Sequence, residues 1–557
     1  MKTLCIKTSS FTVENQVKEL WHMLPEDKYF ETLTENELWQ RYCGFLDLSV
    51  DEWMDIQNQL LMEEIDLVAS STLGKKLMGK RKPKNPDEFR RIVPLTSYDD
   101  YEPYLSERQE SALAVKPKVW CHSSGRGGRF KWIPHTPRFL ERLAKNIIGT
   151  FILATASEKG KVNIQPGVRA FLLLAPSPYA SGCCVENLAQ YFSYQDIPDP
   201  KKSQGLQFPD RMQKGFQEAL KDGVDIIGAL ASILVKMGEQ FEEGSRTRKS
   251  SSTFLHPKIV FTFLKASLRS RREKRTILPK DLWATKAIMT GGMDTTIYRD
   301  AIANYWGNRP YEFFICAEAY CIATQGWNKK AMTFLPDLAF LEFIPYEEIL
   351  KQEDNRDYQP STVLLNELEA GKLYEIVITH LYGGPLLRYR MRDIIKIVAL
   401  KDEEAEVNLP QMEFQRRVDE VISVAGLATL DEKIIWQAIA NTGIKYTEWT
   451  ACKELDHSKN LLRIYLELKE KKEAGKIAAM IDEQLKQIDT DYKDVETYLG
   501  LQPVKVTLLS PGTFERYTEV KRREGANPAH MKPNRINPTE AVIQHLIQLS
   551  EEGKEKC

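Results

Sequence analysis

Between Ile92 and Leu400 the sequence alternates short apolar runs with longer amphipathic stretches. The short runs are typical of buried strands, and the longer stretches place apolar residues at helical spacing. Strands that alternate with helices favour an α/β fold, in which helices cover a sheet. We predict strands over Ala170–Leu174, Phe313–Ala317, Ala339–Phe343, Tyr374–Thr379 and Ile394–Leu400, and helices over Pro137–Ile148 and Val224–Phe241.

The chain is too long for one simple domain, and its pattern becomes simpler after Gly426. At roughly 100–200 residues per domain, 557 residues suit two to four domains. We therefore expect an α/β core over residues 1–424 and a compact α+β domain over residues 425–557. In the second part we predict a β-hairpin over 446–469, one amphipathic helix over 474–499, a strand over Val504–Leu509 and a last helix over Pro538–Ser550.

Charge and cysteine usage exclude several classes of protein. The 77 cationic and 78 acidic residues leave a net charge of -1, which argues against a protein built mainly to coat nucleic acid. The nine cysteines include no CxxC pair, so we expect neither a disulfide framework nor a zinc site. This use of cysteine favours a reducing compartment, and we expect a cytoplasmic location. The segment Ser245–Lys280 holds many cations and one acid, Glu273, which favours a solvated helix face or loop over a nucleic-acid patch.

Membrane insertion is not expected either. The start of the chain lacks the apolar core of a signal peptide. The most apolar stretches, Ala170–Ala175 and Ile226–Val235, fall far short of the roughly 20 residues that span a bilayer. We interpret them as a buried strand and a buried helix.

The segment from His122 to Lys131, HSSGRGGRFK, is the first with visible chemistry. Its glycines and serines allow backbone N–H groups to turn inward, and its cations add positive charge, a combination that suits a polyphosphate. No Walker A pattern is present. Taken alone, the segment is also compatible with an ordinary surface loop.

The surrounding text, IVPLTSYDDYEPYLSERQ…KVWCHSSGRGGRFKWIPHT, resembles the start of the nucleotide site in the plant auxin-responsive (Gretchen Hagen) acyl-acid amido synthetases. This family belongs to the adenylate-forming superfamily, together with firefly luciferase and acyl-CoA synthetases. Its phosphate loop reads roughly SSGTTxGxxK. The positions that match are Ser123, Ser124, Gly125, Gly128 and Lys131, and Arg126 replaces a loop hydroxyl.

Four further segments resemble family motifs in the same order. YEFFICAEAY resembles the stretch that ends in YGSSE, which implies that Phe314 stacks on adenine and that Glu318 binds Mg²⁺. PLLRYRMRDIIKIV resembles LYRYRLGDVV, which implies that Asp393 accepts the ribose hydroxyls beside Tyr389 and Arg390.

The last two segments lie near the end of the chain. FQRRVDEVISVAG resembles the inter-domain hinge. The match implies that Arg417 is the arginine that contacts ribose and phosphate and that Asp419 is the hinge residue. GTFERYTEVKRREGANPAHMKPNRI resembles the family's C-terminal motif. Lys532 matches the catalytic lysine of that motif, which implies the same role.

The resemblance implies a large multi-sheet α/β N-terminal domain and a small α+β C-terminal domain that acts as a mobile lid. It implies that ATP and Mg²⁺ activate a carboxylic acid as an acyl-adenylate, which an amine, such as that of an amino acid, converts to an amide. Leu230 and Leu234 are candidates for the acyl pocket, because the family's counterpart of their helix borders it.

Several positions depart from the family pattern. Arg126 and Gly127 replace the two loop hydroxyls, Ala317 replaces the serine before the glutamate, and Arg392 replaces the glycine before Asp393. Hydrogen bonds to phosphate are lost at such positions, although a guanidinium also fits phosphate oxygens. Two alternatives therefore stay open: transfer of the acyl group to coenzyme A as a thioester, and a degenerate nucleotide-binding homologue without catalysis.

Overall fold

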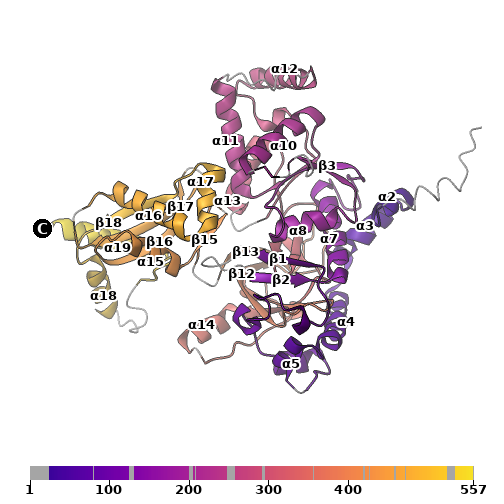
Figure 1. The fold of residues 1–557 in the computed structure, drawn as a ribbon, viewed down its shortest axis with the longest axis horizontal. Helices are drawn as coiled ribbons and strands as arrows, with labels where there is room; N and C mark the ends of the chain where they lie inside the picture. The colour runs from indigo at the N-terminus through magenta and orange to yellow at the C-terminus, as the bar shows by residue number, and fades with distance from the viewer. Residues whose placement is uncertain are drawn as a thin grey trace, which may run out of the picture.

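The structure is a computed structural model (Figure 1). It is described here for residues 24–79, 81–123, 131–199, 203, 205–206, 208–247, 257–291, 295–355, 357–417, 421–425, 427–456, 459–470, 472–523 and 533–555. In the described part of the chain, no helix has the length and apolar character that crossing a bilayer requires.

The described part of the chain begins with five helices. They are α2 (Asp27–Thr32), α3 (Glu35–Cys43), α4 (Val50–Val68), α5 (Thr72–Met78) and α6 (Pro86–Ile92). Thr34 and Ser49 begin α3 and α4 with capping boxes, in which the hydroxyl and a glutamate three residues on satisfy free backbone N–H groups. Helix α4 packs on the strand β10 through its buried face, which includes Trp53 and Gln57.

One sheet of eleven strands forms the core, in the order β10-β11-β12-β13-β9-β8-β7-β6-β5-β3-β4. Separately, β1 (Val119–Ser123) and β2 (Lys131–His135) form an antiparallel pair. The strands of the large sheet are β3 (Val168–Leu173), β4 (Tyr194–Ile197), β5 (Ile226–Ala229), β6 (Ala287–Thr290), β7 (Tyr311–Cys316), β8 (Tyr320–Gln325), β9 (Met332–Phe334), β10 (Ala339–Pro345), β11 (Leu373–His380), β12 (Tyr389–Ala399) and β13 (Gln411–Arg417).

The half of the sheet from β4 to β7 is parallel. Parallel neighbours need crossover connections, and helices supply them here. They are α8 (Ala180–Leu188), α10 (Phe208–Asp222), α11 (Ala231–Thr247), α12 (Pro257–Arg272) and α13 (Thr295–Trp306). In the spatial order 4-3-5-6-7, the chain goes from β3 to β4 on one side and then returns to β5 on the other side of β3. The winding of the chain across the sheet therefore reverses between β3 and β5.

The predicted helix over Val224–Phe241 is wrong in its first turn, because Ile226–Ala229 is the strand β5 and α11 begins only at Ala231. All four residues of β5 are buried. A strand that is covered on both faces is apolar throughout, so its sequence looks like that of a buried helix.

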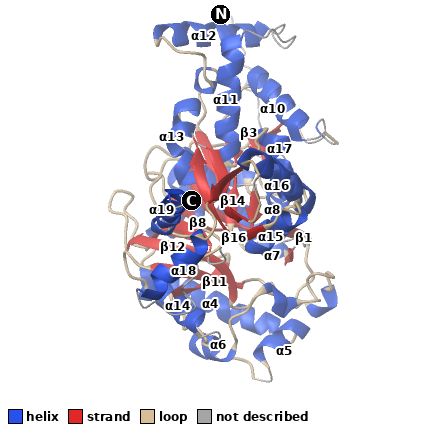
Figure 2. Cartoon of the chain, turned by 90° about the vertical axis from the view of Figure 1, so that its left-hand side faces the viewer, coloured by secondary structure: helices blue, strands red, loops and turns tan. Residues whose placement is uncertain are grey.

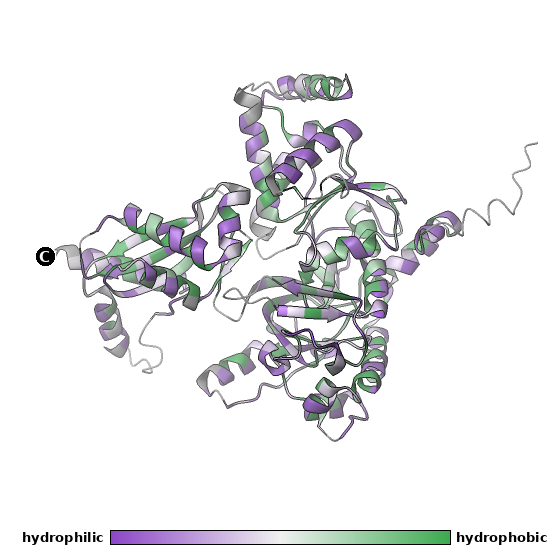
Figure 3. Cartoon of the chain, viewed as in Figure 1, coloured by the Kyte–Doolittle hydropathy of each residue, from purple (hydrophilic) through white to green (hydrophobic). Residues whose placement is uncertain are grey.

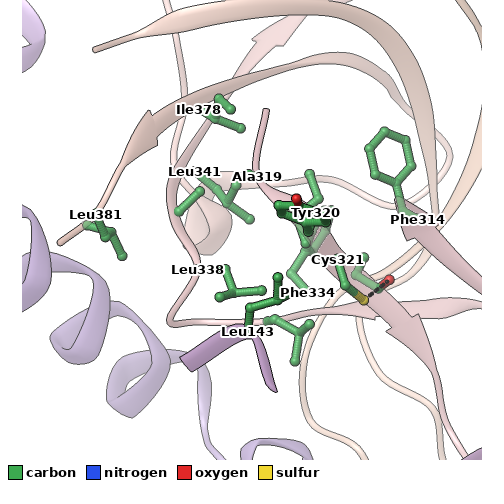
Figure 4. Close-up of a cluster of buried hydrophobic side chains, with 14 of the residues drawn as sticks. Leu143, Phe314, Ala319, Tyr320, Cys321, Phe334, Leu338, Leu341, Ile378 and Leu381 are labelled. Atoms are coloured by element: carbon green, nitrogen blue, oxygen red, sulfur yellow. Dashed lines mark hydrogen bonds between the residues drawn. The ribbon is translucent and has the colours of Figure 1, made fainter. Parts of the chain in front are cut away.

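The other half of the sheet, from β7 to β10, is antiparallel. It contains most of the strands predicted from the apolar runs. Helix α7 (Pro137–Thr155) begins at the cap Thr136 and packs on β8, which confirms the predicted helix at Pro137. Figure 4 shows the core that results, with Leu143 facing Phe334 and Leu338, and with Phe314 to one side.

The C-terminal part has its own small sheet of β16 (Tyr446–Asp456), β17 (Lys459–Leu468) and β18 (Val504–Leu509). The hairpin and the strand predicted there are confirmed. The single helix predicted over 474–499 is two helices, because Asp489 leaves helical geometry and caps the second one by accepting the backbone N–H of Tyr492 at 2.7 Å. The remaining elements are β14 (Ile422–Val424), β15 (Ala428–Leu430), α15 (Glu432–Asn441), α16 (Ala474–Ile488), α17 (Thr490–Leu499), α18 (Thr513–Arg523) and α19 (Glu540–Glu555).

The two parts touch through α17, which packs against α10 and α11 of the parallel half (Figure 1). A mixed α/β core followed by a smaller α+β part is the predicted fold class, and it is confirmed. Helix α14 (Tyr346–Asp354) packs on the far edge of the sheet, against β10 and β11.

Gln57 ties α4 to the sheet and provides a test of this packing. Its buried amide donates to the carbonyls of Ala339, at 2.9 Å, and Pro336, and accepts the backbone N–H of Leu341 at 2.8 Å. We expect Gln57→Leu to lower the free energy of unfolding by about 2–4 kcal/mol, because the backbone partners stay buried without hydrogen bonds.

The measurement is chemical denaturation followed by circular dichroism. Gln59→Leu, on the exposed face of the same helix, is the matched control and should change stability by less than about 0.5 kcal/mol. Equal stabilities of the two variants would contradict the role assigned to Gln57.

Candidate active site

Lys131 and Tyr389 bring together two segments that the sequence predicts for one site. The Lys131 Nζ donates to the Tyr389 hydroxyl at 3.0 Å and lies 5.6 Å from the centre of the Tyr98 ring. Ser123 ends β1 and is paired in register with Lys131, so both flank the glycine-rich loop. The other loop residues predicted to bind phosphate, Ser124, Gly125, Arg126 and Gly128, lie outside the described residues, as do Asp419 and Lys532.

Asp393 lies on β12, four residues after Tyr389, and is paired in register with Arg417 at the end of β13. Successive side chains of a strand point to opposite faces, so Arg390 points away from the face of its neighbour Tyr389. The pairing of β12 with β11 is irregular between Arg390 and Ile394, the stretch in which Asp393 lies. Arg390 is committed to Glu375, with Nε and Nη2 donating to the buried carboxylate at 2.9 and 2.6 Å. Its guanidinium is therefore engaged with the buried Glu375.

Two buried histidines hold the turn that carries Glu318, which joins β7 to β8. The Nε2 of His380 donates to the Glu318 carbonyl at 2.6 Å, and the Nε2 of His135 lies 3.3 Å from the Ala317 carbonyl. A carbonyl only accepts, so each Nε2 carries the proton. Burial lowers the pKa of His380 to about 4 and that of His135 well below its usual value, so both rings stay neutral and fix the turn by hydrogen bonds.

Glu318 and Asp393 lie close enough to act on the same groups. Burial, followed by the Glu318 carboxylate and then by Asp393, raises the pKa of the Cys316 thiol well above its usual value. Glu318 also contributes, after burial and Glu102, to the pKa of Tyr98, which is raised to about 12. Lys131 of β2 approaches the same Tyr98 ring, so Lys131 and Glu318, from the turn after β7, both lie near Tyr98.

Phe314 is buried and lies next to a second aromatic ring. It is 8% exposed, and its ring centre lies 6.0 Å from that of Phe414 on β13. The alternation of β7 directs its neighbours Phe313 and Ile315 to the opposite face, where both line a cavity.

This cavity, with a volume of about 480 Å³, lies at the carboxyl ends of β3, β5 and β6, where the winding of the parallel sheet reverses. Open α/β sheets bind ligands at such a point. Leu230 lines the cavity, whereas Leu234 is fully buried in the core and its carbonyl accepts the Trp306 indole N–H at 2.9 Å. Tyr179 connects the cavity to the loop region, because its ring lies 4.5 Å from His122, next to Ser123.

The polar lining of the cavity was not predicted from the sequence. It includes Arg211, the buried hydroxyl of Thr290, and Asp491 and Asp494 on α17. Burial, with Asp489 and Asp494 nearby, raises the pKa of Asp491 to about 6. These residues come from α10, β6 and α17 and belong to no shared motif.

The carboxylates of Glu318 and Asp393 are hard oxygen donors, the type that Mg²⁺ prefers. They do not form a complete metal site by themselves. Among the residues that the structure describes, no three His, Cys, Asp or Glu side chains are grouped so that they could hold a metal ion alone. Further oxygen ligands would have to come from a substrate.

The neutral histidines predict a pH dependence of stability. The unfolded state binds a proton on His380 below about pH 6.5, and the folded state only below about pH 4, so stability is complete above pH 6.5 and is lost as the pH falls toward 4. We expect protonation of this ring to lower the free energy of unfolding of the native protein by about 3 kcal/mol between pH 6.5 and pH 4. In His380→Gln the amide still donates a hydrogen bond but does not titrate, so this part of the loss should be absent.

Chemical denaturation at intervals between pH 7.5 and 4 measures both curves. The difference between the variants at pH 7.5 is the cost of altered packing and is subtracted. Parallel curves over the whole range would show that His380 is not held neutral.

Comparison with known proteins places this geometry in context. The GH3 family N-terminal, central and C-terminal domains match residues 44–172, 332–417 and 432–541, in this order and together over more than half of the chain. The jasmonoyl–L-amino acid synthetase GH3.5 of Oryza sativa subsp. japonica is 25% identical over 286 residues, which cover 47% of this chain and 46% of the relative. The chain thus spans about half the length of the curated relatives it matches.

Two solved structures share the fold. The acyl acid amido synthetase AtGH3.15 in complex with 2,4-DB aligns with a TM-score of 0.51 at 18% identity, over 94% of this chain and 97% of its own. A 2-hydroxyisobutyryl-CoA ligase in complex with 2-HIB-AMP and CoA aligns with a TM-score of 0.51 at 14% identity, over 85% and 87%. With the three domains matched in sequence, these findings confirm the predicted resemblance: the chain belongs to the GH3 family.

Proposed function

We propose that this protein uses ATP to activate a carboxylic acid and transfers the acyl group to an amine, such as that of an amino acid. In the first step a carboxylate oxygen attacks the α-phosphorus, and pyrophosphate leaves. In the second step the amine nitrogen attacks the acyl carbon, AMP leaves, and the amine loses a proton to form the amide. The names of relatives, among them a jasmonoyl–L-amino acid synthetase and an acyl acid amido synthetase, support this chemistry.

The observation that carries the proposal is that the turn with Glu318 and the start of the glycine-rich loop both adjoin an apolar cavity. Strand β7 lines the cavity with Phe313 and Ile315, and the turn at its end presents Glu318. Tyr179 borders the cavity and contacts His122, at the start of the glycine-rich loop. An acid bound with its apolar group in the cavity would therefore have its carboxylate near the residues that we assign to ATP.

Each polar group has a specific task in this proposal. Asp393 accepts the ribose hydroxyls, Lys131 and the loop hold phosphate oxygens, and Lys532 offsets the negative charge that collects between the carboxylate and the α-phosphate. Fixed cations at such a place are effective because they need no reorganisation during the reaction. Arg417 would contact the ribose and phosphate, Tyr389 fixes the Lys131 ammonium at 3.0 Å, and Phe314 would contact adenine.

Mg²⁺ fits this site as a partner of the nucleotide. Glu318 supplies a carboxylate oxygen, and its turn is fixed by His135 and His380, so the donor is held in place. Mg²⁺ is usually bound by one or two carboxylates together with substrate phosphates, and it offsets phosphate charge. Glu318 is therefore our candidate for the protein ligand.

The C-terminal part would act as the lid of the cavity. We propose that the core ends at residue 424, that residues 425–557 form the lid, and that Asp419 is the hinge. Leu427, Asp491 and Asp494 of this part line the cavity, which supports a covering role. Leu230 would contact the acyl group, whereas Leu234 would support α11 from within the core.

We also propose a cytoplasmic location. Every cysteine that the structure describes is a free thiol, including the adjacent Cys183 and Cys184. Free thiols are typical of a reducing compartment.

Exchange of labelled pyrophosphate into ATP tests the first step, with a panel of aryl and alkyl acids. We expect at least one acid to support exchange, and Lys532→Ala to lower its rate at least ~100-fold, as removal of a charge-stabilising group does elsewhere. Asp393→Asn should raise the KM for ATP roughly tenfold, because a hydrogen bond to a charged group is weakened.

Lys476→Ala, at an exposed lysine of the C-terminal part, is the matched control and should leave exchange unchanged. Absence of exchange with every acid, together with no thermal stabilisation by MgATP, would exclude the enzyme. Absence of exchange with retained stabilisation by MgATP would indicate the degenerate nucleotide-binding homologue. Products formed with amino acids and with coenzyme A, compared by mass spectrometry, separate amide from thioester formation.

A further inference from the structure

Helix α12 has an apolar stripe that faces solvent. Val260, Phe261, Leu264 and Leu268 are 41, 58, 58 and 69% exposed, and their spacing places them along one side of the helix. Figures 1 and 2 show α12 at one extremity of the molecule, away from the large sheet. Figure 3 shows hydrophobic residues along it.

The opposite side of α12 already attaches the helix to the protein. Ile259 and Ala266 are buried there, and Phe263 stacks on Phe241 of α11 with ring centres 6.4 Å apart. The exposed stripe is therefore a second apolar face, which the packing of this helix does not require. A surface helix normally presents polar residues on that side.

Cations accompany the exposed stripe. Lys258, Lys265, Arg269, Arg271 and Arg272 are all exposed on this helix. The Lys265 Nζ lies 4.4 Å from the centre of the Phe261 ring, so one cation reaches over an apolar side chain of the stripe.

The nearest acid in sequence is already paired beyond the end of the helix. Glu273 pairs with Arg275 at 2.6 Å and with Arg269 at 3.4 Å. The stripe therefore keeps a positive margin, formed above all by Lys265, Arg271 and Arg272.

We propose that α12 docks the protein on an anionic lipid surface, lying flat with Phe261, Leu264 and Leu268 at the level of the acyl chains. Amphipathic helices with an apolar stripe and a basic margin bind in this way, without spanning the bilayer. The charge selects the occupant. A second copy would bring the same cations face to face, and a nucleic acid would leave the apolar stripe in water. This inference does not depend on the proposed reaction.

Co-sedimentation of the full chain with vesicles tests the proposal. We expect binding to phosphatidylcholine vesicles that contain about 30% phosphatidylserine, and little to pure phosphatidylcholine, since each cation near an anionic surface strengthens binding. Phe261→Ser/Leu264→Ser should lower binding at least ~10-fold through lost apolar burial. Lys265→Glu/Arg272→Glu should lower it by a similar factor, and about 0.5 M salt should do the same in the native protein.

The matched control is Leu350→Ser/Leu400→Ser, which removes two apolar side chains of 42 and 48% exposure elsewhere and should leave binding unchanged. Circular dichroism and the melting temperature check that each variant is folded. Three outcomes would overturn the proposal: no binding to anionic vesicles, binding that Phe261→Ser/Leu264→Ser does not weaken, or a vesicle-free dimer that the same double change dissociates.

Discussion

The candidate site depends on the pairing of β7, which is parallel to β6 on one edge and antiparallel to β8 on the other. The parallel edge connects β7 to the crossover helices and to the cavity at their strand ends. The antiparallel edge requires a tight turn, and that turn carries Glu318. Because side chains alternate along the strand, Phe313 and Ile315 face the cavity while Phe314 packs on the other side against Phe414. One strand therefore sets both the apolar wall and the position of the carboxylate.

His135 and His380 extend this constraint to the other site elements. His135 shares a face of β2 with Lys131, and His380 ends β11, the neighbour of the strand that carries Asp393. Their contacts to the carbonyls of the turn connect the three elements without a covalent link. A charged imidazole would be costly at these buried positions, so the connection depends on both rings being neutral.

Local pattern predicts much of the fold and fails where tertiary context decides. Apolar periodicity identifies strands such as Ala339–Pro345 and the hairpin that starts at Tyr446. It does not distinguish strand β5 from a helix, because both faces of β5 are buried. It also misses the break at Asp489, because apolar spacing continues through it, and a capping aspartate is the available signal there.

The same distinction applies to the site. Motif position identifies Lys131, Tyr389 and Asp393, and the first two are in contact. It does not indicate that Arg390, next to Tyr389, pairs with the buried carboxylate of Glu375. Motifs do not reveal Thr290 and Arg211 either, because each is placed by a different crossover of the sheet.

Balanced composition conceals how the cations are used. In the segment Arg388–Arg392 the first two arginines are bound to Glu342 and Glu375, carboxylates that are almost completely buried, and so support the antiparallel half of the sheet. Buried ion pairs contribute little net charge to their surroundings. The cations left to act outward include those exposed on α12. A net charge near zero is thus compatible with a local basic region, because acids elsewhere in the fold balance it.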